Sequence, residues 1–192
     1  MTRALTMRIL GAAVLLVGLL VALVVRENLA RTQGREVRLP MEAVDPRALL
    51  TGHYVALQVT QLQAPGQPCP PGSGTALKPG WIALTPTATG ERVTGVAADR
   101  AAAAKFGPIQ LKGTARCWGD PREPTERARV SVDIGVRRFH ASQAEAEAFD
   151  KALRDRKVGE VSAWAIVSVG EDGRGRLKGV IVGDQRADLT WK

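Results

Sequence analysis

One apolar run dominates the N-terminal end of the sequence. Seventeen residues without a charge, 9–25, stand between Arg8 and Arg26. A helix needs about 20 apolar residues to cross a hydrocarbon core, and arginines at both ends extend a shorter run by reaching the interfaces. A cleaved signal peptide is the alternative, but its site fits poorly, because Asn28 stands two positions before Ala30, the best candidate. We therefore predict an uncleaved signal anchor that crosses the lipid bilayer through residues 9–25.

Beyond the anchor, the pattern alternates between apolar and polar positions, which is typical of half-buried strands. A first segment, 37–41, alternates, but Pro40 confines it to a sheet edge or a strand end. Hairpin turns are predicted at TATGE and at GEDGRG. The stronger strands, about eight in all, are predicted at 53–62, 81–86, 92–96, 109–117, 128–136, 161–169, 176–182 and 187–191.

One helix is predicted with a full set of signals in the soluble part, over 142–155. Ser142 and Glu145 form a capping box, and an apolar stripe follows. The segment 98–106 fits either a short helix or a loop. The sequence thus predicts an α+β, mainly β fold: an N-terminal transmembrane helix, then a mostly antiparallel sheet or barrel with one helix packed on it. Three parts are expected: a signal anchor (1–26), a linker (27–36) whose first residues continue the helix, and a single extracytoplasmic β-rich domain (37–192).

Two features bear on the side of the membrane where the domain lies. Four arginines follow the apolar run within thirteen residues and two precede it, which favours the cytoplasm, although large domains after a short basic tail often translocate regardless. Cys69 and Cys117 favour the opposite side, since an even number of cysteines is compatible with a disulfide in an oxidising compartment. Such a bond would stabilise the fold by about 4 kcal/mol, and two unrelated reduced cysteines are the alternative.

The charge pattern argues against nucleic acid as a partner. Three of the 27 basic side chains flank the apolar run, which leaves 24 for the rest of the chain against 19 acidic ones. These basic residues are scattered, whereas nucleic-acid binding proteins gather them in a stripe. A basic face beside an anionic membrane is the simpler account.

No residue pattern predicts a catalytic, cofactor or metal site. His53 and His140 lie at strand ends, where an ordinary polar role is the simplest interpretation. Asp133 and Glu160 are expected to be solvated strand carboxylates and not an acid–base pair. No phosphate loop is present, and two cysteines 48 positions apart make no zinc site by themselves. We therefore predict no cofactor and no metal.

The segment DPRALLTGHYVALQV (45–59) resembles the signature of the GDYXXLXY family, bacterial membrane-anchored proteins without an assigned activity. Gly52, Tyr54 and Leu57 match the motif, whereas His53 replaces its aspartate and Val59 its final tyrosine. RLKGVIVGD (176–184) and RRFHASQAEAEAFDKAL (137–153) also look similar to the family. The resemblance implies a single-pass protein of the bacterial inner membrane with a periplasmic domain, and a polytopic membrane protein as a possible partner.

Two functional hypotheses follow. The first is a membrane-tethered interaction module that binds a membrane or envelope protein, because an anchor is present and no catalytic pattern is. The alternative is a cell-envelope hydrolase or peptidase whose site is assembled by the fold, with His53 and Tyr54 as its candidate groups.

Overall fold

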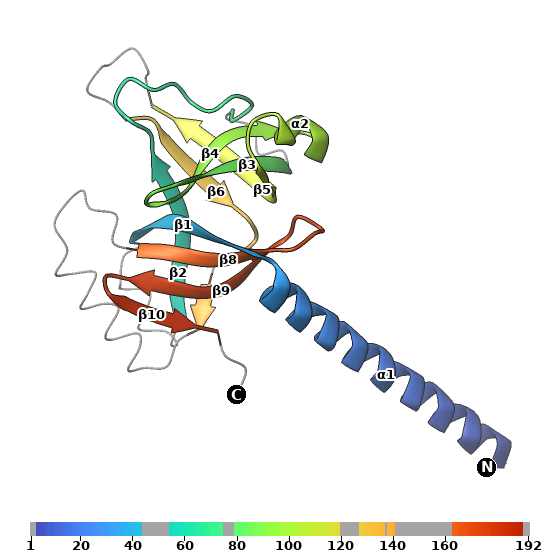
Figure 1. The fold of residues 1–192 in the computed structure, drawn as a ribbon. Helices are drawn as coiled ribbons and strands as arrows, with labels where there is room; N and C mark the ends of the chain where they lie inside the picture. The colour runs from blue at the N-terminus through green and yellow to red at the C-terminus, as the bar shows by residue number, and fades with distance from the viewer. Residues whose placement is uncertain are drawn as a thin grey trace.

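A computed structural model describes residues 3–43, 54–74, 79–119, 127–136, 138–140 and 163–189 (Figure 1). The predicted helix over 142–155 lies outside these residues. Within them the structure contains a long helix, a short helix and ten strands. In chain order they are α1 (Arg3–Gln33), β1 (Arg35–Ala43), β2 (Tyr54–Leu62), β3 (Gly80–Thr87), β4 (Gly90–Ala97), α2 (Arg100–Ala104), β5 (Ile109–Trp118), β6 (Arg129–Asp133), β7 (Arg138–His140), β8 (Ala163–Val169), β9 (Gly175–Val182) and β10 (Gln185–Asp188).

Helix α1 projects from the β domain and is long and apolar enough to span a membrane over Leu5–Gln33 (Figure 1). Its apolar side chains lie exposed along the whole segment, as expected of a surface that lipid would cover. The segment 27–36, which we expected to be a linker, is helix up to Gln33 and strand from Arg35. Gly34 is the single residue between the helix and the strand. A side chain does not fit here, because a Cβ would collide with Ser168 and lie 2.9 Å from the Val169 carbonyl oxygen.

The strands form an open antiparallel sheet, which confirms the mainly β fold and selects a sheet over a barrel. Their order is β10-β9-β8-β1-β2-β6-β5-β3-β4, and β7 pairs with β2 beside this path. Figure 1 shows two groups, β1 with β8–β10 and β3–β6, with β2 running between them. Strand β1 lies inside the order and not at an edge. Pro40 is its last residue to pair with β8, and Met41 is the first to pair with β2.

The core between the two groups is aliphatic, as the low aromatic content requires. Alternation along β5 is as predicted, with Ile109, Leu111, Ala115 and Cys117 buried. Strand β6 is shorter than predicted and ends at Asp133. The largest fully buried side chains come from both groups of strands: Leu39, Ile82, Leu84, Leu111, Ile166, Val37, Val93, Val130, Val167 and Val180.

The far end of the sheet folds back onto its middle, so that β4 lies against β1. The side-chain amide of Gln61 on β2 donates to the Glu91 carbonyl oxygen and accepts from the Val93 N–H, both at 2.8 Å. The Glu91 carboxylate accepts from the Arg38 N–H of β1. Side chains therefore join strands that no backbone ladder connects.

A loop and a disulfide cover the other side of β4. The Val96 N–H donates to the Pro71 carbonyl oxygen at 2.8 Å. Cys69, from the same loop, is bonded to Cys117 of β5, with their Cα atoms 5.7 Å apart. The short helix α2 forms in the segment that fitted either a helix or a loop. Its N-cap is Asp99, whose side chain accepts from the Ala102 N–H.

Candidate functional site at the joint between helix and domain

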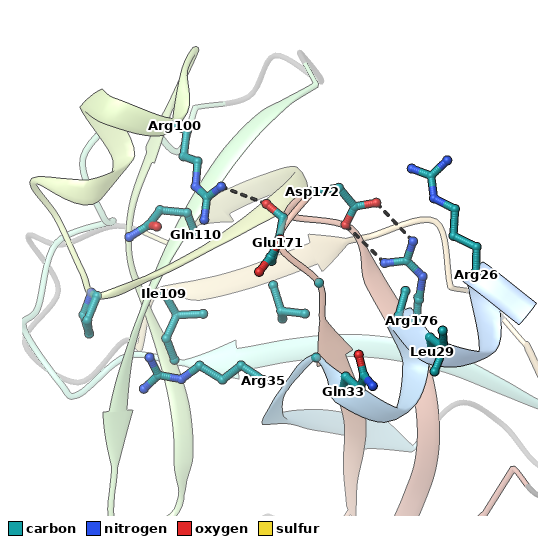
Figure 2. A pocket seen from close by; sticks show the side chains of 15 residues that line it. Arg26, Leu29, Gln33, Arg35, Arg100, Ile109, Gln110, Glu171, Asp172 and Arg176 are labelled. Atoms are coloured by element: carbon teal, nitrogen blue, oxygen red, sulfur yellow. Dashed lines mark hydrogen bonds and ion pairs between the residues drawn. The ribbon is translucent and has the colours of Figure 1, made fainter.

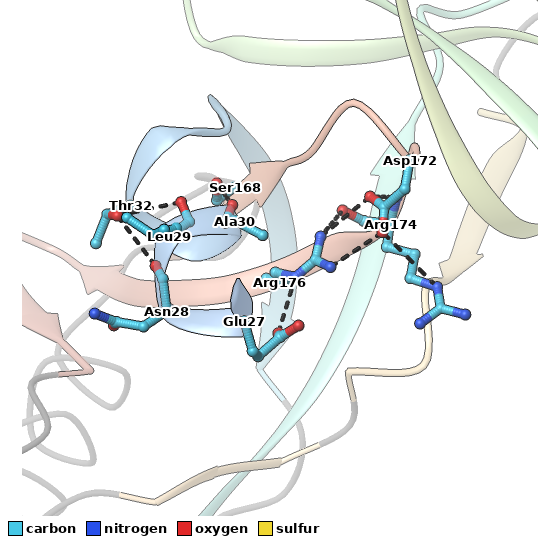
Figure 3. A network of polar contacts seen from close by, with 9 residues as sticks. All are labelled: Glu27, Asn28, Leu29, Ala30, Thr32, Ser168, Asp172, Arg174 and Arg176. Atoms are coloured by element: carbon cyan, nitrogen blue, oxygen red, sulfur yellow. Dashed lines mark hydrogen bonds and ion pairs between the residues drawn. The ribbon is translucent and has the colours of Figure 1, made fainter. Parts of the chain in front are cut away.

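The end of α1 is fixed to the domain by polar contacts with β8 and β9, and the turn between these strands supports one of the contacts (Figure 3). Arg176 of β9 donates from Nε to Glu27 of α1 at 2.8 Å. Its two terminal nitrogens bind both carboxylate oxygens of Asp172 at 3.0 and 3.2 Å. Ser168 of β8 donates to the Ala30 carbonyl oxygen at 3.2 Å. Helix α1 is therefore attached to the domain by packing and hydrogen bonds as well as by the chain.

Arg176 is the centre of this network, and its side chain is only 11% exposed. Hydrogen bonding to Arg176 lowers the pKa of Asp172 to about 2 from an ordinary value of 3.8. The same hydrogen bond raises the pKa of Arg176. Both shifts favour the charged forms, so the pair is ionised at neutral pH.

The turn between β8 and β9 also docks on the other group of strands. The Lys112 N–H of β5 donates to the Gly173 carbonyl oxygen at 2.7 Å. Gly173 has a φ of +74°, and a Cβ here would collide with the Trp81 ring. Arg100 and Lys112 stand over this ring at 5.6 and 5.0 Å from its centroid. The turn therefore contacts β5 and Trp81 through Gly173, and through Asp172 it holds Arg176, the residue that binds α1.

A cavity of about 640 Å³ opens between the end of α1, this turn, α2 and the start of β5 (Figure 2). Four arginines on four different elements border it: Arg26, Arg35, Arg100 and Arg176. Arg100 donates to the Glu171 carbonyl oxygen at 2.8 Å across one side. The acidic side chains that border the cavity are Glu171 and Asp172. The lining is mostly polar and basic, and it includes the apolar side chains of Leu29, Ile109 and Val169.

A second ion-pair cluster fixes β1 to β9 and β10, next to the joint. Glu36 accepts from Lys178 at 2.9 Å and lies 3.7 Å from Arg186. The hydrogen bond from Lys178 lowers the pKa of Glu36. Because all three side chains are about a third or more exposed, this cluster contributes little to stability.

The motif residues that the structure describes lie on β2, and none of them borders the cavity. Gly52 and His53 fall outside the described residues. Tyr54 pairs in the backbone register with His140 of β7, so the motif tyrosine and the second histidine are cross-strand neighbours. Leu57 pairs with Ala43 of β1. The structure describes the backbone of these paired residues.

Val59 is the motif position whose side chain the structure describes. It is 4% exposed and pairs with Met41 on one side and Val132 on the other. An aliphatic residue suits this core position, where the family motif has a tyrosine. The motif strand is thus the one that joins the two groups of strands, which is a structural role. The described residues add no observation in favour of an enzyme built on His53 and Tyr54.

Sequence reasoning missed the joint and its cavity. The GEDGRG segment predicts a hairpin turn alone, and the structure shows that its Asp172 also holds Arg176, the residue that binds Glu27 of α1. The one signal in the sequence was Glu27, a single acid directly after the basic end of the apolar run. Within the described part of the chain, no group of three or more His, Cys, Asp or Glu residues could hold a metal ion.

Comparison with known proteins identifies one matching protein family. The model of the GDYXXLXY protein family matches residues 16–180. The match begins inside α1 and ends within β9, so it includes the joint and nearly the whole β domain. No curated protein and no solved structure matches the chain.

Proposed function

Because the chain belongs to the GDYXXLXY protein family, we propose that it is a membrane-anchored interaction module that binds a membrane or envelope protein. The family has no assigned activity. The resemblance of this chain to the family implies a polytopic membrane protein as a possible partner. The proposal rests on one observation, the way in which α1 is attached to the domain.

That attachment gives the domain a defined position beside the bilayer. A single residue, Gly34, separates α1 from β1, and Arg176 and Ser168 hold the last turns of the helix. A domain that only needed a tether would be served by a flexible linker. A fixed orientation instead presents the same face of the domain to a neighbouring membrane protein at every encounter, which lowers the entropy cost of binding.

We further propose that the domain lies outside the cytoplasm, as a single-pass protein of the bacterial inner membrane. The disulfide between Cys69 and Cys117 supports this side, since disulfides persist in oxidising compartments. The four arginines that follow the apolar run argue the other way, and large domains often translocate despite such charges.

Site-specific photo-crosslinking of the full chain in living cells tests the partner. A photoreactive residue replaces either Val21 on α1 or Phe106 next to α2. The Val21 side chain is 56% exposed and the Phe106 side chain 38% exposed. We expect both positions to give an adduct with the same membrane protein. Asp184, in the exposed turn between β9 and β10, is the control position and should give much less. Repeated absence of a protein adduct from Val21 and Phe106 would contradict the proposal.

A further inference from the structure

Outside α1, three large apolar side chains of the described residues are exposed: Leu62, Phe106 and Trp118. Two of them belong to one row across the sheet, because Leu62 of β2 and Trp118 of β5 both pair with Arg129 of β6. Residues directly opposite each other on antiparallel strands share a face, with Cβ atoms about 5 Å apart. A leucine, an arginine and a tryptophan thus lie side by side in a row, the Trp118 row.

The Trp118 row lies on the outer face of the sheet. Its neighbours along the three strands, Gln61, Val130 and Cys117, are buried. Successive side chains of a strand point to opposite faces, so the row points away from the core. Leu62 and Trp118 are 40% and 47% exposed, so the row presents apolar surface to solvent on both sides of its arginine.

The surface around the Trp118 row is basic. Arg116 is exposed and stands two positions before Trp118, on the same face of β5. Arg127 is exposed and stands two positions before Arg129. Strands β2, β5 and β6 together carry one acidic residue, Asp133, which is four positions from Arg129. The charge next to the exposed indole is therefore positive.

The Trp118 row is distant from the joint with α1. Strand β5 begins at Ile109, which borders the cavity at the end of α1. Trp118 stands nine positions further on, which is about 30 Å along an extended strand. Figure 1 shows β5 running away from α1. The lipid head groups form a layer only about 5–8 Å thick beside a membrane-spanning helix, so the partner of this row is a molecule in the aqueous phase.

The strand ends that carry the row are fixed in place. Cys117, which precedes Trp118, is bonded to Cys69. At the end of β2, the Gln63 N–H donates to the Ala128 carbonyl oxygen at 2.8 Å, which extends the pairing of β2 with β6. A surface that is ordered before binding loses less entropy when a partner binds. Tryptophan and arginine are also the residue types that contribute most to binding at protein interfaces.

We propose that the Trp118 row binds an acidic segment of a protein in the aqueous phase. An apolar side chain of that segment packs on Trp118 and Leu62, and its carboxylates face Arg116 and Arg127. Charge complementarity selects an acidic segment, and the exposed indole and leucine supply the apolar contact. This surface is separate from α1 and from Phe106, so the inference goes beyond the proposed function and does not depend on it.

Selection of displayed peptides on the full-length protein in lipid nanodiscs tests this surface. The probe is a library of random twelve-residue peptides on phage, and the enriched peptides are then titrated by fluorescence anisotropy. We expect these peptides to combine aspartate or glutamate with a large apolar residue. The double variant Leu62→Ser/Trp118→Ser should bind them at least about tenfold more weakly, because truncation of a central tryptophan removes much of the energy of an interface.

The matched control is Phe106→Ser, which removes the exposed apolar side chain that lies outside the row and should leave binding unchanged. The charge is tested separately, so that the result does not depend on the folding of the double variant. Arg116→Gln should weaken binding about threefold and reduce its salt dependence, whereas Lys105→Gln, at another exposed position, should do neither.

Three results would overturn the proposal. The first is equal weakening by Phe106→Ser and by Leu62→Ser/Trp118→Ser. The second is a selection that enriches no acidic peptide whose binding depends on the row. The third is displacement of the bound peptide by an equal concentration of a twelve-nucleotide oligodeoxythymidine, which would assign the row to nucleic acid and not to a protein. Retention of the crosslinks from Val21 in any of these cases would leave the proposed function standing.

Discussion

The side-chain amide of Gln61 pairs with the backbone of Val93 as if it were a strand residue. It accepts from the Val93 N–H and donates to the Glu91 carbonyl oxygen, and it is 4% exposed. Because β2 and β4 share no backbone ladder, this one side chain satisfies backbone groups that would otherwise be buried without partners. It also holds the far edge of the sheet against the middle strands.

Replacement of Gln61 by leucine should therefore destabilise the fold strongly. A buried donor or acceptor left without a partner costs about 1–3 kcal/mol. The substitution leaves two such groups, the Val93 N–H and the Glu91 carbonyl oxygen. We expect a loss of about 2–4 kcal/mol in the free energy of unfolding, measured by chemical denaturation of the full chain in detergent. Gln58→Leu, on the same strand but at an exposed position, is the control and should change stability by less than about 0.5 kcal/mol. Similar losses in both variants would mean that the amide pairing is unimportant.

Gly173 lies against Trp81, so its replacement by alanine should destabilise the fold more than the same replacement at Gly66, which has a similar backbone conformation. Gly173 and Gly66 have φ values of +74° and +72°, but only Gly173 has a neighbour within 4 Å of a built Cβ. Alanine at Gly66 should cost about 1 kcal/mol from backbone conformation alone. Alanine at Gly173 should cost about 1–3 kcal/mol more, because the turn must move away from the ring. Equal losses in chemical denaturation would show that the turn is not packed on the indole.

Loss of Arg176 should loosen the joint without unfolding the sheet. Arg176→Gln removes the contact to Glu27 and the paired contact to Asp172. We expect trypsin to cleave after Arg31 or Arg35 about fivefold faster, as a local loss of about 1 kcal/mol would allow. Arg174→Gln is the control, since Arg174 is 73% exposed and stands 4.0 Å from Asp172. If cleavage is equally slow in both variants, the ion pairs do not hold the helix.

Acid should weaken the same joint through Asp172. Its pKa is about 2 in the fold and 3.8 when unperturbed, chiefly because Arg176 donates to it. A lowered pKa means that the stabilising contribution is complete above about pH 4 and disappears as the pH falls to about 2. Solvent screening limits it to below about 1 kcal/mol, since the carboxylate is 38% exposed.

The measurement for this prediction is the difference in stability between the unmodified chain and Asp172→Asn. That difference should be present at pH 6 and approach zero near pH 2. Asp184→Asn, in an exposed turn, serves as the control. A difference for Asp172→Asn that is independent of pH would refute the assignment of the effect to this carboxylate.

Local patterns in the sequence were sufficient for most of the strands, but they did not predict β7, and β10 begins two residues before the predicted segment 187–191. Alternation along β5 correctly predicted which side chains are buried, because every second residue of this strand faces the same core. The hairpin of β3 and β4 followed from the turn chemistry between Pro86 and Gly90. The contact between Gln61 and β4 was not predicted, although the sequence holds a signal for it. Gln61 is in phase with Val59, on the face that alternation assigns to the core.

The strand order and the joint depend on contacts distant in sequence, and a local pattern carries no information about them. Strand β1 lies between β8 and β2, from opposite ends of the chain. Arg176 reaches Glu27 across 149 positions. The polar segment 26–36 was expected to continue the helix and then become a linker; the helix does continue to Gln33, but Gly34 alone takes the place of the linker. Tertiary contacts with Ser168 and Arg176 decide this outcome.

The central claim is that α1 holds a disulfide-bonded domain outside the cytoplasm. Labelling of intact spheroplasts with a membrane-impermeant maleimide, before and after an impermeant phosphine reductant, tests both parts together. We predict no label before reduction and label on Cys69 after it, since Cys69 is the more exposed of the two cysteines. Label that appears only after lysis, without any reductant, would place reduced cysteines in the cytoplasm and contradict the account.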